Sequence, residues 1–175
     1  MNILHEIIGF FLSPIKENYT KKLAIITIVS SIIATILTII SVEILGFSIE
    51  TNPLYNTLGP TLFYLVTKLM FIVAFVIISI LKAINDWAVR RELKKGRIVP
   101  NLKIHRVTLL ILAIGCLIDA VHDALDLLSI YIRELVPLSI ITLRLLHEDI
   151  WVIILLAIII HFAHITITKE YKHTY

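Results

Sequence analysis

Hydrophobic residues fill four long runs of the chain, and shorter polar segments separate these runs. The runs cover about residues 23–45, 61–82, 108–132 and 150–167. Each has about the 17 to 25 residues that an α-helix needs to cross a hydrocarbon core near 30 Å thick. The pattern predicts an all-α integral membrane protein with four transmembrane helices arranged as two hairpins.

A shorter apolar stretch precedes the first run. Residues 1–13 place apolar side chains at helical spacing, but the stretch is too short to span a bilayer and Pro14 ends it. We expect a short helix that lies in the membrane interface. The whole chain, residues 1–175, is then a single membrane domain in which residues 83–107 form a basic linker between the hairpins.

The two hairpins carry a faint sign of internal repetition. The segment from Glu50 to Leu54 (ETNPL) resembles the segment from Glu134 to Leu138 (ELVPL). The same offset places Thr38 on His122, so that a polar site would be kept only in the second hairpin. The hairpins are therefore a candidate for a degenerate parallel repeat.

Composition supports the membrane class, and the distribution of charge predicts the orientation. Hydrophobic residues make up 58% of the chain and charged residues 17%, whereas soluble domains carry about 25% charged residues. The net charge of +3 does not require a nucleic-acid partner, because Lys and Arg cluster between the apolar runs, as the positive-inside rule expects. By that rule both termini and the linker are cytoplasmic. The expected location is the cell membrane, and the expected partners are the lipid bilayer and a second copy or a membrane complex.

Four ionisable residues interrupt the third run, within the segment GCLIDAVHDALDLL. They are Asp119, His122, Asp123 and Asp126, and their spacing places all four on one face of a helix. Inserting three Asp residues near the bilayer centre would cost about 8 to 10 kcal/mol. We therefore expect this face to meet polar partners, water or a metal ion.

The fourth run adds two His residues on one helix face, His161 and His164. If residues 133–149 form an outer loop, the rise of an α-helix places His122 roughly 16 Å and His161 roughly 18 Å below the outer boundary. By the same count, Asp119 and His164 both lie roughly 21 to 22 Å deep. The two pairs are then expected to face each other.

The second run contains one basic residue, Lys68. Counted from the start of its run, it lies roughly 13 Å deep, between the depths of Asp126 and Asp123. An unpaired ammonium group at this depth would be costly. We therefore expect an ion pair between Lys68 and Asp126 or Asp123.

Three functional interpretations of these residues remain open. The first is a divalent transition-metal site for zinc, iron or manganese, built from groups that these ions prefer as ligands. The second is haem b held between His122 and His161, which is less favoured because the neighbouring carboxylates gain nothing from a macrocycle. The third is a metal-free relay of protons or ions, as a subunit of a membrane complex. The alternative without a chemical role is hydrogen bonding between helices. The ligands of the metal site would be Asp119, His122, Asp123, His161 and His164.

The metal site is the preferred interpretation, because ligand binding would offset the cost of inserting the carboxylates. It would support either a metal-dependent reaction inside the membrane or metal transit. The sequence has no P-loop, HExxH or GxSxG motif, so the chain is not assigned as an enzyme. A single cysteine, Cys116, excludes an internal disulfide and a Cys-based zinc knuckle.

Overall fold

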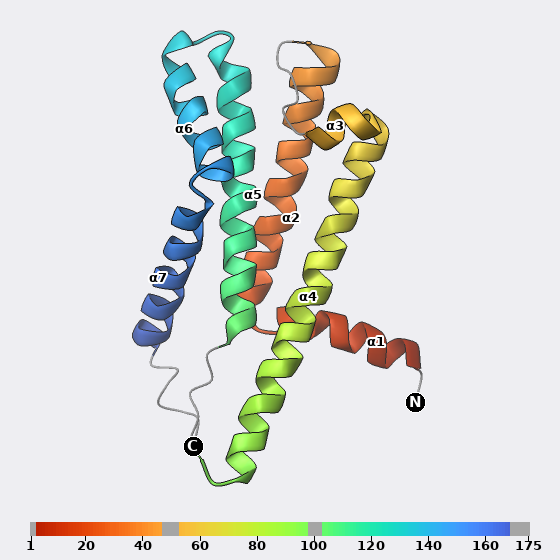
Figure 1. Cartoon of the computed structure of the whole chain (residues 1–175), viewed down its shortest axis with the longest axis vertical. Helices are drawn as coiled ribbons and strands as arrows, with labels where there is room; N and C mark the ends of the chain where they lie inside the picture. Colours follow the sequence, from red (N-terminus) through yellow and green to blue (C-terminus); the bar gives the residue numbers. More distant parts are fainter. Residues whose placement is uncertain (1–2, 47–52, 98–102, 169–175) are drawn as a thin grey trace.

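The computed structural model of the chain describes residues 3–46, 53–97 and 103–168, and these residues form helices joined by short connections (Figure 1). This confirms the predicted all-α class. In chain order the elements are α1 (Ile3–Leu12), the 3₁₀ turn η1 (Ser13–Ile15), α2 (Asn18–Thr38), the π-helical segment η2 (Ile39–Ile44), α3 (Pro53–Leu58), α4 (Pro60–Lys94), α5 (Ile104–Ser129), the 3₁₀ turn η3 (Arg133–Leu135), α6 (Val136–His147) and α7 (Ile150–Thr168).

Three helices of the described chain are long and apolar enough to cross a membrane, namely α2 with η2, α4 and α5. The α6 and α7 helices pass the same test only as a pair, and a bend of 79° separates them. Large apolar side chains are exposed along these helices, including Ile32, Ile72 and Leu155. Apolar surface of this extent is typical of a protein that lies in lipid and not of a soluble monomer.

The predicted outer loop at residues 133–149 is largely helical. Its segment VPLSIITLRLLH forms α6, with Pro137 in the first turn, where a missing N–H costs nothing. In Figure 1, α6 lies beside one half of α5 and α7 lies beside the other half. The fourth apolar run is therefore only the second part of the bent helix pair, and residues 150–167 begin near the middle of the bundle (Figure 1).

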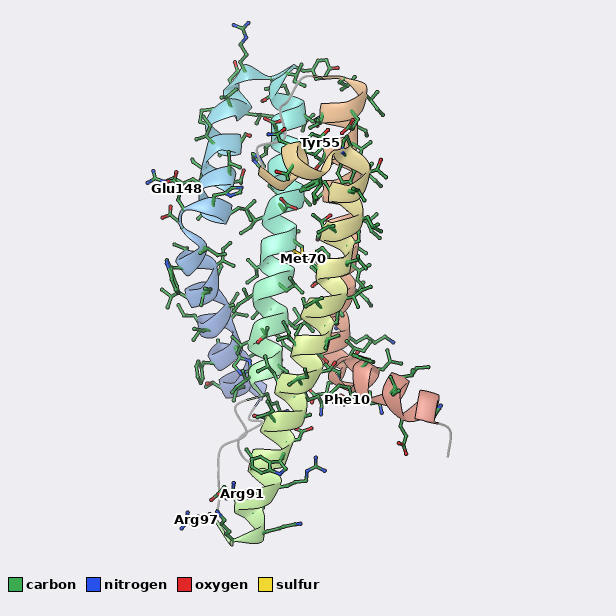
Figure 2. The ribbon with its side chains drawn as sticks, turned by 45° about the vertical axis from the view of Figure 1, so that its right-hand side comes forward. Phe10, Tyr55, Met70, Arg91, Arg97 and Glu148 are labelled. Carbon is green, nitrogen blue, oxygen red and sulfur yellow. The ribbon has the colours of Figure 1, made fainter. Side chains whose placement is uncertain are left out.

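The predicted linker at residues 83–107 is also mostly helical, because α4 continues to Lys94 and α5 begins at Ile104. The added turns of α4 contain Arg, Glu, Leu and Lys, which favour helices in water as well as in lipid. The Lys82 ammonium pairs with Asp86 at 2.5 Å, one turn further along. Figure 2 shows Arg91 and Arg97 beyond the end of the bundle, so hydropathy predicted the apolar part of α4 and not its full length.

The α2 and α5 helices run in the same direction, side by side, and form the centre of the bundle (Figure 1). The face of α2 turned toward α5 consists of small residues spaced alternately four and three apart. Small side chains at this spacing allow two helix backbones to approach closely. These residues are Thr20, Ala24, Thr27, Ser31, Ala34, Thr38 and Ser41.

The half of the bundle where α2 and α5 begin, which we call the sealed half, has a packed apolar core and also buries polar side chains, among them Thr20, His105 and His161. Its buried core consists of Leu23, Ala24, Ile78, Leu109, Leu110, Ala113 and Ala157. An ion pair closes its outer edge, where Nε of Arg106 donates to Glu17 at 2.7 Å. The α1 helix joins the same end, where the Ser79 hydroxyl donates to the Phe11 carbonyl at 3.3 Å.

Candidate functional site

The other half of the bundle contains a partly open cavity of about 700 Å³, which we call the acidic cavity. Residues of α2, α4, α5 and α6 line it. Figure 2 shows Tyr55 of α3 near this end of the bundle, where its ring packs against those of Phe63 and Tyr64. The polar and charged residues of the lining are Ser31, Thr35, Thr38, Ser41, Tyr64, Thr67, Lys68, Asp119, His122, Asp123, Asp126, Ser139 and His147.

The four ionisable residues of the third run all line this cavity. Asp119, His122, Asp123 and Asp126 follow one another at helical spacing along α5. The three carboxylates therefore lie at successive levels of one wall, from the middle of the bundle toward its end. The structure places the predicted polar face against a cavity of small-molecule size, in the range of about 300 to 1,000 Å³ that is typical of ligand pockets.

Asp123 connects this wall to α2. The Thr38 hydroxyl donates a hydrogen bond of 2.8 Å to Oδ2 of Asp123. The π-helical segment η2 begins at the next residue, Ile39, and contributes Ser41 to the lining. Interruptions of this kind are frequent at functional sites, since they redirect side chains that a regular helix would place elsewhere.

His122 is held by α6. Its Nδ1 lies 3.1 Å from the carbonyl oxygen of Ser139 and 3.2 Å from the hydroxyl of Thr142. Because a carbonyl oxygen can only accept, this contact requires the proton on Nδ1. In the neutral ring Nε2 then carries a lone pair, which can accept a proton or bind a cation.

Lys68 is held by α2. Its ammonium donates to the Ser31 hydroxyl at 2.9 Å and also to the hydroxyl of Thr35. It lies 5.4 Å from the ring centre of Phe71, a cation–π distance. The predicted ion pair with Asp126 or Asp123 stays a prediction. Asp119 lies close enough for its charge to attract this ammonium.

The two His residues of the fourth run lie in the other half of the bundle. The ring of His164 stacks on Tyr19 with centres 4.3 Å apart. Tyr19 and Thr38 lie 19 residues apart along α2, or roughly 28 Å by the rise of an α-helix. His161 is one turn from His164 and is 1% exposed. The structure therefore does not bring His161 and His164 to Asp123.

The depth count that predicted this convergence started from Asp149, and the bend at Asp149 lies well inside the bundle. In the described part of the chain, no group of three His, Cys, Asp or Glu side chains is gathered closely enough to hold a metal ion. The described geometry thus gives no support to the five-residue metal site, nor to haem between His122 and His161. Asp119, His122 and Asp123 still share one wall.

Comparison with family models, with curated proteins and with solved structures finds no match for this chain.

Several residues of the cavity had no place in the sequence-based prediction. The hydroxyls of Ser31, Thr35 and Thr38 hold the charged side chains, and the rings of Phe63 and Phe71 form part of the wall. The spacing of small residues in α2 was a usable signal for the hydroxyls. No comparable pattern marks the aromatic residues, since Phe is common on every face of a membrane helix.

Proposed function

We propose that this protein is an integral membrane protein that binds cations in the acidic cavity in exchange for protons, as a carrier or relay does. The composition of the lining supports this proposal most directly. It has three carboxylates and one ammonium group, so the ionised lining carries a net charge of −2 when its His residues are neutral. Such a lining attracts cations and disfavours anions.

The cost of burying charge supplies the physical basis for the exchange. An ionised carboxylate in a membrane-embedded site is expensive unless a positive charge compensates it. Lys68 compensates one of the three carboxylates. The remaining net charge of −2 is best balanced by protons when the cavity is empty and by a cation when it is occupied. Each carboxylate that binds the cation releases its proton to the solution, and Nε2 of His122 is placed to accept such a proton and pass it on.

Access to the cavity from one side fits this role. The polar lining ends near Ser31 and Lys68, and below them the apolar core around Leu109 and Ile78 fills the interior. Basic residues gather at the sealed end, including Lys21 and Arg91. By the positive-inside rule, we place the sealed end in the cytoplasm and the cavity toward the outside. Transport would then require the sealed half to open.

The order of the elements supports the finer architecture that we propose. A long helix, a short helix and a second long helix follow one another in α2, α3 and α4, and again in α5, α6 and α7. The helices α2 and α5 run in parallel, as a parallel repeat requires. We propose four transmembrane segments, of which the last is the bent pair α6 and α7. The α1 helix would lie in the membrane interface.

Proton release on cation binding tests the proposed function. The purified protein would be placed in weakly buffered detergent solution with a pH-sensitive dye, and salts of sodium, calcium, zinc and an organic ammonium ion would be added in turn. At least one cation should release up to two protons per chain, the number expected from the net charge of the lining. The Asp123→Asn variant should release fewer, because the amide holds no exchangeable acid proton.

Asp149→Asn is the matched control. It removes a carboxylate of the same type that lies outside the cavity lining, beside Arg144 at the bend. Asn also serves as a helix cap, so α7 keeps its start. The control should release as many protons as the unmodified chain. If no cation releases more protons from the unmodified chain than from Asp123→Asn, the proposed function is rejected.

A further inference from the structure

The acidic cavity is much larger than a bare cation needs. Its volume is about 700 Å³, whereas a water molecule occupies about 30 Å³ in the liquid. An inorganic ion bound there would leave most of the space to water. The size of the cavity therefore points to an organic occupant.

The walls of the cavity differ in chemistry. The wall from α5 carries the carboxylates of Asp119 and Asp123, whereas the wall from α4 carries the rings of Phe63 and Phe71. The wall from α6 adds apolar side chains, among them Leu143. Carboxylates attract a positive charge, and aromatic faces attract the same charge while also packing against apolar groups. Together the walls match a molecule that is cationic at one end and apolar at the other.

The protein already shows how this cavity binds an ammonium group. The Lys68 ammonium meets the hydroxyl of Ser31, the hydroxyl of Thr35 and the face of Phe71. These contacts come from α2 and α4, whereas the carboxylates lie on the α5 wall of the same cavity. Their negative charge attracts a second ammonium group, and each carboxylate has two oxygens that can accept several hydrogen bonds.

We propose that the occupant of the acidic cavity is an organic ammonium ion with an apolar body, whose charge lies at Asp119 and Asp123 and whose body packs between α4 and α6. This inference rests on the proposed function, because it names the class of cation that exchanges with protons. Neither a bare metal ion nor a proton alone would use the aromatic and aliphatic walls.

Paired probes test the inference. We would compare 4-phenylbutylammonium with its neutral analogue 4-phenylbutanol, using calorimetry on the full chain in lipid nanodiscs. The two probes share an apolar body and differ in charge. The ammonium should bind saturably, whereas the alcohol should only partition into the lipid. Asp123→Asn should weaken binding of the ammonium by about 30-fold, because the bound charge loses its partner.

Two further variants distinguish a specific loss of binding from misfolding. Phe71→Leu keeps an apolar side chain and every carboxylate, and it should weaken binding of the ammonium by about tenfold through the lost cation–π contact. Asp149→Asn should bind the ammonium as the unmodified chain does. Equal binding of both probes, or equal binding by all variants, would overturn the inference. Proton release by sodium, calcium or zinc but not by the ammonium probe would also overturn it and would leave the proposed function standing. No release by any cation would reject both.

Discussion

The cavity half and the sealed half are built from the same two central helices, yet one holds a charged cavity and the other a packed core. In the sealed half Leu109 and Ala113 of α5 are buried with Leu23 and Ala24 of α2. In the cavity half the corresponding positions of α2 are Ser31, Thr35 and Thr38, and those of α5 include Asp119 and Asp123. The outer helices differ as well, since α7 covers the sealed half and α6 covers the cavity half (Figure 1).

The difference shows that the packed apolar core and the acidic cavity occupy different halves of the bundle. A tight core on one side allows the other side to carry groups that destabilise it. The cost of the carboxylates is limited by the hydroxyl of Thr38 and by the charge of Lys68. The comparison predicts that the same kind of substitution has different effects in the two halves.

The largest effect is expected at the ion pair that closes the sealed half. Arg106 is 3% exposed, so Glu17→Gln would remove the carboxylate that pairs with a buried guanidinium. We expect a loss of roughly 3 kcal/mol in the free energy of unfolding, since breaking a buried ion pair by removing one partner is strongly destabilising. Chemical unfolding in mild detergent measures it. Glu6→Gln on α1 is the control, and an equal loss there would contradict a specific role of the pair.

Replacing a buried Ala by the larger Leu should affect the two halves differently. Ala113 and Ala34 are both buried, at 2% and 3% exposure, but only Ala34 lines the cavity. Ala113→Leu should cost about 1 to 3 kcal/mol, because the sealed half has no space for three more carbon atoms. Ala34→Leu should cost less, because its side chain can extend into the cavity. Melting temperatures of both variants check this, and equal losses would contradict the comparison.

A smaller loss of stability is expected at the hydrogen bond that joins α2 to α5 in the cavity half. Thr38→Val keeps the shape of the side chain and removes the hydrogen bond to Asp123. The expected cost is about 1 kcal/mol, because one partly buried side-chain hydrogen bond is lost. Thr166→Val on α7, where the hydroxyl donates to the Phe162 carbonyl of its own helix, is the control. Equal melting temperatures for the two variants would count against a structural role of the bond.

The smallest effect concerns the partner of Lys68. A double-mutant cycle of Lys68→Met with Asp119→Asn should give a coupling of roughly 0.5 to 1 kcal/mol, because their charges attract across the cavity. The cycle with Asp126→Asn should give less, since no contact joins Lys68 to that carboxylate in the described chain. A stronger coupling to Asp126 would support the ion pair predicted from the sequence.

Much of the fold was predictable from the sequence, because lipid imposes a fixed length on apolar helices. The positions of α2, α4 and α5 follow from hydropathy, and the single polar face of α5 follows from the spacing of its Asp residues. The bend between α6 and α7 was not predictable in this way. Arg144 and the segment HED resemble a loop on a hydropathy scale, although they pair with each other at the bend.

The candidate site was predictable only in part, for a related reason. Helical spacing is a local property, so it grouped Asp119, His122 and Asp123 correctly on one face. Whether His161 and His164 face the Asp residues depends on the register between α5 and α7. The prediction took Asp149 as the outer boundary of the membrane, but Asp149 lies inside the bundle, so the predicted depths of both His residues were wrong. The hydroxyls of α2 were visible as a repeating pattern of small residues, but their binding to Lys68 and Asp123 depends on tertiary packing.

The central claim is that the acidic cavity opens to water on one side of the membrane and ends at the sealed half. It is tested most directly by the reaction of single cysteines with membrane-impermeant thiol reagents, in a Cys116→Ser background. Thr67→Cys lines the cavity, and Thr27→Cys lies buried in the sealed half. We expect Thr67→Cys to react only from the side on which α3 lies, and faster with a cationic reagent than with an anionic one of similar size, while Thr27→Cys stays unmodified from both sides. Reaction of Thr67→Cys from both sides, or at equal rates with both reagents, would contradict the account.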